Sequence, residues 1–205
     1  MRRVFILDGY VDEPTCLGVP PYISPYPRYI AGAAWDFDCQ TLVSYATIDQ
    51  IRNKNALLET ASKSDILVVI AGMAVPGRYL SGLPVSPQEL LTYLSSISQP
   101  IKILCGPAAR YGFGTSGGKS VTETEIVKNV FDIIATGDGE LIVSELLKNK
   151  LNKEKIDPSL CRHLPKEIQN FAVKGAQIIT QHPFFPEYLI TEIVFHGSGY
   201  GAHGE

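Results

Sequence analysis

Long apolar segments are absent from this sequence. No apolar run approaches the roughly 20 residues that a membrane-spanning helix needs. The opening MRRVFILDGY contains a short apolar run that ends at Asp8, well below the roughly 7–15 residues of a signal-peptide core. We therefore expect no membrane partner, and we interpret the opening run as a first buried strand.

A strong net charge is absent as well. The formal net charge is −3 at pH 7 and charged residues make up 19% of the chain. This balance gives no electrostatic reason to expect nucleic acid or an anionic membrane surface as a partner. Hydrophobic residues reach 45% of the 205 residues, which excludes wholesale disorder and suits one full domain with a short annex.

Metal-ligand and catalytic motifs are the third absence. The cysteines are scattered without C-x-x-C spacing and lie at Cys16, Cys39, Cys105 and Cys161. We therefore expect neither a zinc site nor a disulfide framework. Instead we expect reduced thiols in a cytoplasmic protein. No G-x-S-x-G elbow and no assignable Ser/His/Asp or Cys/His set occurs, so we predict no catalytic residue. His196 and His203 stand in a glycine-rich tail, which we interpret as an unstructured terminus and not a metal site.

One stretch resembles a phosphate-binding loop but fails its spacing. Residues 112–120 read GFGTSGGKS, and the pattern G-x-x-x-x-G-K-[ST] would require glycine where Phe113 stands. A helix is expected to follow, and a helix start favours anions. Lys119 and Ser120 therefore remain candidates for contact with an anion at the rim of the fold.

Strand and helix patterns alternate along the first 150 residues. Apolar runs bounded by Gly, Pro or Asp predict parallel strands at residues 4–7, 41–48, 66–71, 101–105 and 133–135. Capping patterns at Ser86–Glu89, residues 122–125 and residues 138–140 predict helix starts, and a further helix is expected around residues 29–34. The alternation predicts an α/β, flavodoxin-like, doubly wound sheet of five parallel strands in the order 2-1-3-4-5.

In such a sheet, ligands bind outside the carboxyl ends of the strands, where the strand order reverses. The loops to consider are residues 8–21, 72–84, 106–119 and 136–140. The first is rich in proline and tyrosine, and we interpret it as a lid or a domain interface. The last reads TGDGE, and it is either a tight turn with a helix cap or a place where glycines let the backbone approach a ligand.

The C-terminal quarter has a different character. Lysine alternates with polar residues after Asn149, and prolines follow, so residues 149–187 read as a linker with peripheral helices. Residues 176–180 and 188–195 suggest two short strands. We expect residues 1–148 to form the α/β domain, and residues 188–205 to be the truncated start of a following domain or a disordered tail.

Four stretches together resemble one family. DGYVDEPTCLGVPPYISPYPRYIAGA, GMAVPGRYLSGLPVSP, CGPAARYG and TGDGE are similar to the N-terminal B12-binding-like domain of archaeal radical SAM proteins, the Fe-S oxidoreductases. The resemblance runs from about residue 3 to residue 193. It implies a flavodoxin-like domain followed by a barrel that binds a [4Fe-4S] cluster and S-adenosylmethionine.

The resemblance also implies where a cofactor would bind and what is missing. Cobalamin domains carry D-x-H-x-x-G after the first strand, and here Tyr10 stands at the position of the cobalt-ligating histidine. The C-x-x-x-C-x-x-C cluster motif is absent, so the cluster and S-adenosylmethionine would belong to the missing barrel. The strand-end residues that would line a cleft for cobalamin, another corrinoid or the barrel are Asp8, Gly9, Tyr10, Gly72, Met73, Gly106, Pro107, Gly137, Asp138, Gly139 and Glu140.

This sequence therefore predicts a non-catalytic, cobalamin-binding-like part of a radical SAM enzyme. Two alternatives stay open. The chain could be a stand-alone nucleotide-binding α/β protein that uses GTSGGKS, or an interaction domain with an empty cleft.

Overall fold

The computed structural model describes residues 1–9, 25–54, 56–72, 84–113, 127–162 and 167–183. These contain a five-stranded parallel sheet in the order β2-β1-β3-β4-β5, which confirms the predicted α/β doubly wound fold. All five predicted strands are present, and they are β1 (Arg3–Asp8), β2 (Leu42–Thr47), β3 (Ile66–Ile70), β4 (Ile101–Cys105) and β5 (Ile133–Ile134).

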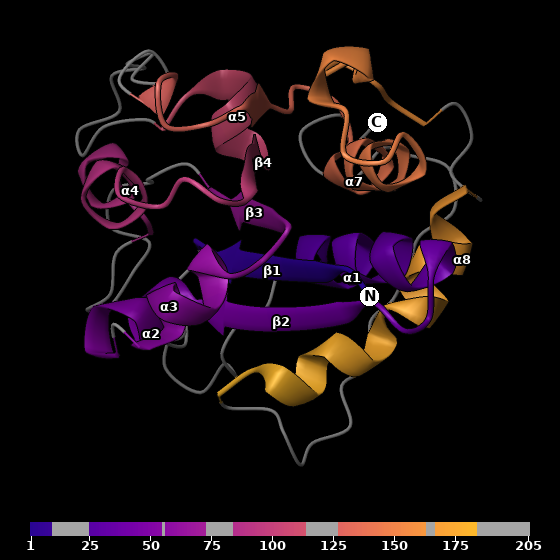
Figure 1. Cartoon of the computed structure of the whole chain (residues 1–205), viewed down its shortest axis with the longest axis horizontal. Coiled ribbons are helices and arrows are strands. Elements are labelled where there is room, and N and C mark those ends of the chain that lie inside the picture. The colour runs from indigo at the N-terminus through magenta and orange to yellow at the C-terminus, as the bar shows by residue number, and fades with distance from the viewer. Residues whose placement is uncertain (10–24, 55, 73–83, 114–126, 163–166, 184–205) are drawn as a thin grey trace, which may run out of the picture.

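Two layers of helices cover the sheet (Figure 1). One face packs on α2 (Ile48–Asn53), α3 (Ala56–Ser62), α4 (Pro87–Leu94) and α5 (Pro107–Tyr111). The other face packs on α1 (Tyr26–Phe37) and α7 (Gly139–Lys148). Successive residues of a strand face opposite layers, so Phe5 and Leu7 lie in the first core and Val4 and Ile6 in the second. Because both faces are buried, the strands read as continuous apolar runs, which is why they could be found in the sequence.

Local hydrogen bonds start and stop the helices as the sequence indicates. Ser86 caps α4 in a complete capping box with Glu89, as predicted, and Thr47 forms a second box with Gln50 at the start of α2. The buried Lys102 side chain donates to the carbonyl oxygens of Leu94, the last residue of α4, at 3.4 Å and of Ile97, just beyond it, at 2.6 Å. A cation at this end of a helix is favoured by the helix dipole. The helix start predicted at residues 122–125 lies outside the described residues.

The segment after α7 returns to the sheet. It includes the short turn η1 (Lys153–Lys155), α8 (Glu167–Lys174) and η2 (Ala176–Gln181). Helix α8 packs on α1 so closely that a Cβ at Gly32 would lie 1.9 Å from the carbonyl oxygen of Phe171. A glycine is therefore required at this helix crossing. In the described ranges, no helix has the length and apolar character that crossing a membrane demands.

The predicted strand at residues 176–180 is wrong, because these residues form the 3-10 helix η2. Figure 1 shows η2, in yellow, beside the edge strand β2. The Gln181 side chain takes the place of a neighbouring strand there: its Oε1 accepts from the Tyr45 amide at 2.7 Å and its Nε2 donates to the Val43 carbonyl at 3.0 Å. A side-chain amide thus satisfies backbone groups that a sixth strand would otherwise pair. The other expected strand, residues 188–195, lies outside the described residues.

Candidate functional site

The predicted site lies at the carboxyl edge of the sheet. The structure describes nine of its eleven strand-end residues, and Tyr10 and Met73, like the anion candidates Lys119 and Ser120, lie outside the described residues. Parallel pairing places Asp8 beside Ile70 and Ile70 beside Cys105, so three strand ends form one row. Gly72 is buried just beyond β3.

The strand order reverses between β1 and β3, and Gly9 occupies this point. Its amide donates to the carbonyl oxygen of Ile70 at 2.7 Å, and its own carbonyl accepts from the Val85 amide at 2.8 Å. A Cβ on Gly9 would lie 2.4 Å from Val85 Cγ1 and 2.5 Å from the Ile70 oxygen. The protein's own backbone and Val85 therefore fill the space beside Gly9.

Asp8 points into the core between the sheet and α1, with 2% of its surface exposed. The Tyr45 hydroxyl, from β2, donates to Asp8 Oδ2 at 2.9 Å. The His182 ring lies 6.1 Å from the Tyr45 ring, and burial lowers the pKa of His182 to about 4. Tyr45 and His182 were not predicted, since only strand register brings Tyr45 to Asp8 and only the return of the C-terminal segment brings His182 to Tyr45.

Cys105 ends β4 and is 1% exposed. Burial, together with the negative charges of Glu140 and Asp8, raises the pKa of its thiol far above the ordinary value. A thiol held neutral in this way is a poor nucleophile and a poor metal ligand. Gly106 follows at φ +87°, a backbone conformation that favours glycine, and Pro107 begins α5.

The TGDGE turn contacts another part of the chain itself. The amides of Gly137 and Asp138 donate to the carbonyl oxygens of Pro158 and Leu160, both at 2.8 Å. A Cβ on Gly137 would lie 2.1 Å from the Leu160 oxygen. The close backbone approach that these glycines permit is therefore to residues 158–160. Asp138 stands at the N-cap position of α7, but its carboxylate makes no capping hydrogen bond.

Asp138 and Glu140 instead pair with two arginines. Asp138 accepts from the Arg162 amide at 2.9 Å and from Arg110 Nη2 at 3.4 Å. Arg162 Nη1 donates to Glu140 Oε1, and Glu140 is 3% exposed. Burial raises the pKa of Glu140 to about 7, although Arg162 acts to lower it. Tyr26 of α1 also lies among these groups, and its pKa is raised by burial and by Cys105.

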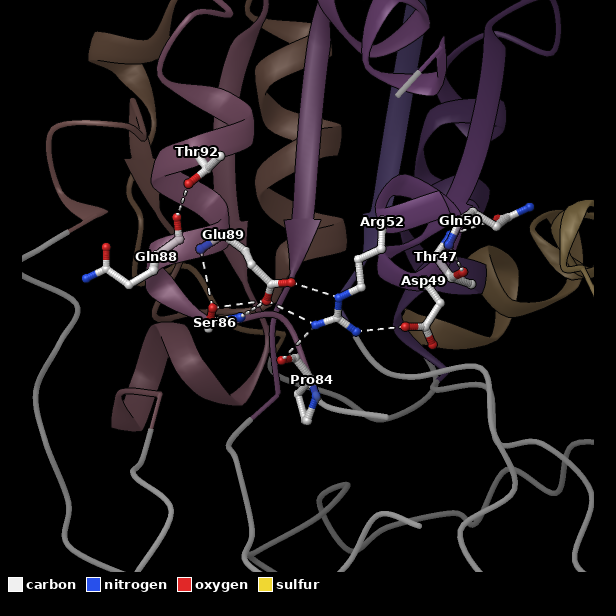
Figure 2. Close-up of polar contacts among 9 residues, drawn as sticks. All are labelled: Thr47, Asp49, Gln50, Arg52, Pro84, Ser86, Gln88, Glu89 and Thr92. Atoms are coloured by element: carbon white, nitrogen blue, oxygen red, sulfur yellow. Dashed lines mark hydrogen bonds and ion pairs between the residues drawn. The ribbon is translucent and has the colours of Figure 1, made fainter. Parts of the chain in front are cut away.

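A second polar cluster lies at the same edge on the opposite face of the sheet (Figure 2). Arg52, at the end of α2, donates from Nε and Nη2 to the two Glu89 oxygens at 2.7 and 3.0 Å. Its Nη1 donates to Asp49 at 2.7 Å, and Nη2 reaches the Pro84 carbonyl at 3.5 Å. Burial would raise the pKa of Glu89, but the hydrogen bonds from Arg52 and Ser86 hold it below the ordinary value. Arg52 thus ties α2 to the start of α4, next to the Val85 that pairs with Gly9.

The buried acidic residues at the carboxyl edge hold elements of the fold together through their hydrogen bonds and ion pairs. Asp8, Asp138 and Glu140 are each paired with side chains of the same chain. Within the described part of the chain, no three His, Cys, Asp or Glu side chains gather as metal ligands. The start of α7 is closely packed, since a Cβ at Gly139 would lie 3.1 Å from Cys105 Cβ and 3.7 Å from Ile30 Cδ1. Side chains already fill the space between β4, α1 and α7.

The chain is similar to two curated archaeal proteins. It is 40% identical over 192 residues to the uncharacterized protein MJ0274 of Methanocaldococcus jannaschii, an alignment that covers 93% of this chain and 34% of that protein. It is 34% identical over 200 residues to an uncharacterized protein of Archaeoglobus fulgidus, covering 97% of this chain and 33% of that protein. The chain thus spans about a third of the length of these relatives. No protein-family model and no solved structure matches it.

Replacing Arg52 should loosen the junction between α2 and α4. We expect Arg52→Met to lower the free energy of unfolding by about 1–2 kcal/mol, because Glu89 and Asp49 are left partly buried without their cation. Urea denaturation measures the change. Lys63→Met, in an exposed pair with Glu59, is the matched control and should cost less than about 0.5 kcal/mol. Equal effects of the two substitutions would contradict the assignment.

Glu140 should make the stability of the fold depend on pH. Its pKa is about 7 in the folded chain against an ordinary 4.5, so its contribution is fully present below pH 4.5 and lost as pH rises through 7. We expect Glu140→Gln to remove this loss, worth up to about 3 kcal/mol between pH 5 and pH 8. Denaturation midpoints at several pH values provide the test. Glu145→Gln, on the exposed side of α7, should keep the wild-type slope, and a Glu140→Gln variant with that same slope would disprove the effect.

Proposed function

We propose that this chain is a B12-binding-like α/β domain of a radical SAM iron-sulfur protein, and that it serves as a non-catalytic docking domain without a corrinoid of its own. The carboxyl edge of its sheet would face the barrel that binds the [4Fe-4S] cluster and S-adenosylmethionine. The reaction would take place in that barrel. This chain would contribute a rigid surface next to it.

The observation that carries this proposal is the filled carboxyl edge. The strand order 2-1-3-4-5 is the one expected for such a domain, and its edge is where ligands normally bind. Here Gly9, Gly137 and Gly139 are pressed against other parts of the same chain, and the buried acids have partners of their own. An edge built in this way favours contact with another protein domain over enclosure of a large cofactor.

The length of the relatives also supports the proposal. They are about three times as long as the aligned region, which leaves room for a barrel outside it. Tyr10 stands at the position where cobalamin domains carry the cobalt-ligating histidine, so we propose no role for cobalamin in this chain.

The relative from M. jannaschii, of which the alignment covers 34%, allows a direct test of the proposed barrel. We expect the full-length protein, reconstituted with iron and sulfide without oxygen, to show the electron paramagnetic resonance signal of a reduced [4Fe-4S] cluster. With dithionite as the one-electron donor, it should also cleave S-adenosylmethionine to methionine and a 5′-deoxyadenosyl radical, which is recovered as 5′-deoxyadenosine after it abstracts a hydrogen atom. The present chain, treated in the same way, should retain no cluster. A full-length protein without a cluster would overturn the radical SAM assignment.

Titration with hydroxocobalamin tests the absence of a corrinoid. Because the described strand ends are filled, we expect no change in the visible absorption spectrum when the present chain is added at high micromolar concentration. Free imidazole, which ligates cobalt, serves as the positive control for the spectral change. A saturable shift with the protein would show that this domain holds a corrinoid after all.

A further inference from the structure

Residues 157–162, called the strap below, cross the end of β5 and the first turn of α7. The strap begins in a tight turn, in which the Asp157 carboxylate accepts from the Ser159 amide at 2.9 Å and the Ser159 hydroxyl at 2.7 Å. It then runs beside residues 136–140, where Pro158 and Leu160 accept the amides of Gly137 and Asp138. The strap ends at Arg162, whose backbone amide donates to Asp138 and whose guanidinium donates to Glu140 and lies 3.9 Å from Asp138 Oδ2.

One attachment of the strap, the bond from Arg162 to Glu140, involves a group whose pKa lies near neutrality. The backbone hydrogen bonds at Pro158 and Leu160 do not change with pH near neutrality. The bond between Arg162 and Glu140 does, because a neutral carboxyl loses the ion pair. The groups facing Glu140 from the surrounding elements are Arg162 of the strap, Asp138 of the turn, Arg110 of α5, Cys105 of β4 and Tyr26 of α1.

We propose that the strap is a pH-sensitive latch, closed over residues 136–140 while Glu140 is ionised and released when Glu140 takes up a proton. Release would uncover residues 136–140 at the β5 end of the carboxyl edge of the sheet. The latch is a property of this chain and stands whether or not the domain belongs to a radical SAM protein.

Whether acid opens or closes the latch depends on which groups around Glu140 move away with the strap. Elements other than the strap also face Glu140: Tyr26 of α1 and Cys105 of β4 interact with it, and the neighbouring Gly139 is packed against Cys105. The burial that raises its pKa to about 7 therefore persists, while Arg162, which lowers the pKa, departs. Glu140 then binds a proton more tightly in the released form, so acid favours release. Global unfolding, in contrast, exposes Glu140 to water and lowers its pKa to the ordinary value. Acid therefore opposes global unfolding, although it favours release of the strap.

Hydrogen exchange measured by NMR on the present chain tests the latch. The reporters are the amides of Gly137, Asp138 and Arg162, which the closed strap protects. We expect their protection factors, corrected for intrinsic exchange, to fall several-fold and by at most about 10-fold from pH 8 to pH 6, since one proton binds to a group whose pKa is about 7 in the closed form. The amides of β3 and β4 should remain protected. Equal protection of the three reporters at both pH values would overturn the proposal.

Substitutions separate the latch from a general loss of structure. Glu140→Gln should give weak protection of the reporters at both pH values, and Arg162→Gln should do the same from the other side of the pair. Glu145→Gln is the control on the same helix and should keep the wild-type response. Should Glu140→Gln fail to fold, Arg162→Gln decides alone. Wild-type protection in Arg162→Gln at pH 8 would disprove the role of the pair.

Discussion

The position of β1 between two parallel neighbours is the constraint on which the rest of this molecule depends. Its six residues pair with β2 on one side, and five of them pair with β3 on the other. This fixes where every other strand must end, and so sets the row of Asp8, Ile70 and Cys105. The chain must then leave β1 at its most crowded point, between two strands. Position 9 therefore requires glycine, because any side chain there would collide with Val85 and Ile70.

The same crowding explains the electrostatics of the edge. Asp8 and Glu140 are acids with at most 3% of their surface exposed, and a carboxylate removed from water is unfavourable without a partner. Tyr45 supplies a hydroxyl to one and Arg162 a guanidinium to the other. On the opposite face Arg52 meets Glu89 in bidentate geometry. Each partner comes from a distant part of the sequence, so satisfying these acids also holds together elements that do not follow one another in the chain.

Much of the fold could be predicted from the sequence, because the determining signals are local. Buried parallel strands are continuous apolar runs, and the capping box at Ser86 identifies the start of its helix from four residues. For the candidate site, the positions of its residues at the strand ends could be predicted, but the groups that surround them could not. Asp8 and Glu140 were placed at strand ends from the pattern alone, whereas their partners Tyr45 and Arg162 are 37 and 22 residues away. The η2 error has the same origin: its apolar residues suggest a strand, but the side chain of Gln181 already pairs the exposed edge of β2.

That pairing by Gln181 has a consequence for how the molecule meets other molecules. An open edge strand offers its amides and carbonyls to any passing β-segment, including that of a second copy, and is a common route to aggregation. A glutamine amide offers the same donor and acceptor as a peptide group but ends after one residue, so it cannot propagate a sheet. At Val43 and Tyr45 the β2 edge is therefore less open to the addition of a strand from a neighbouring molecule.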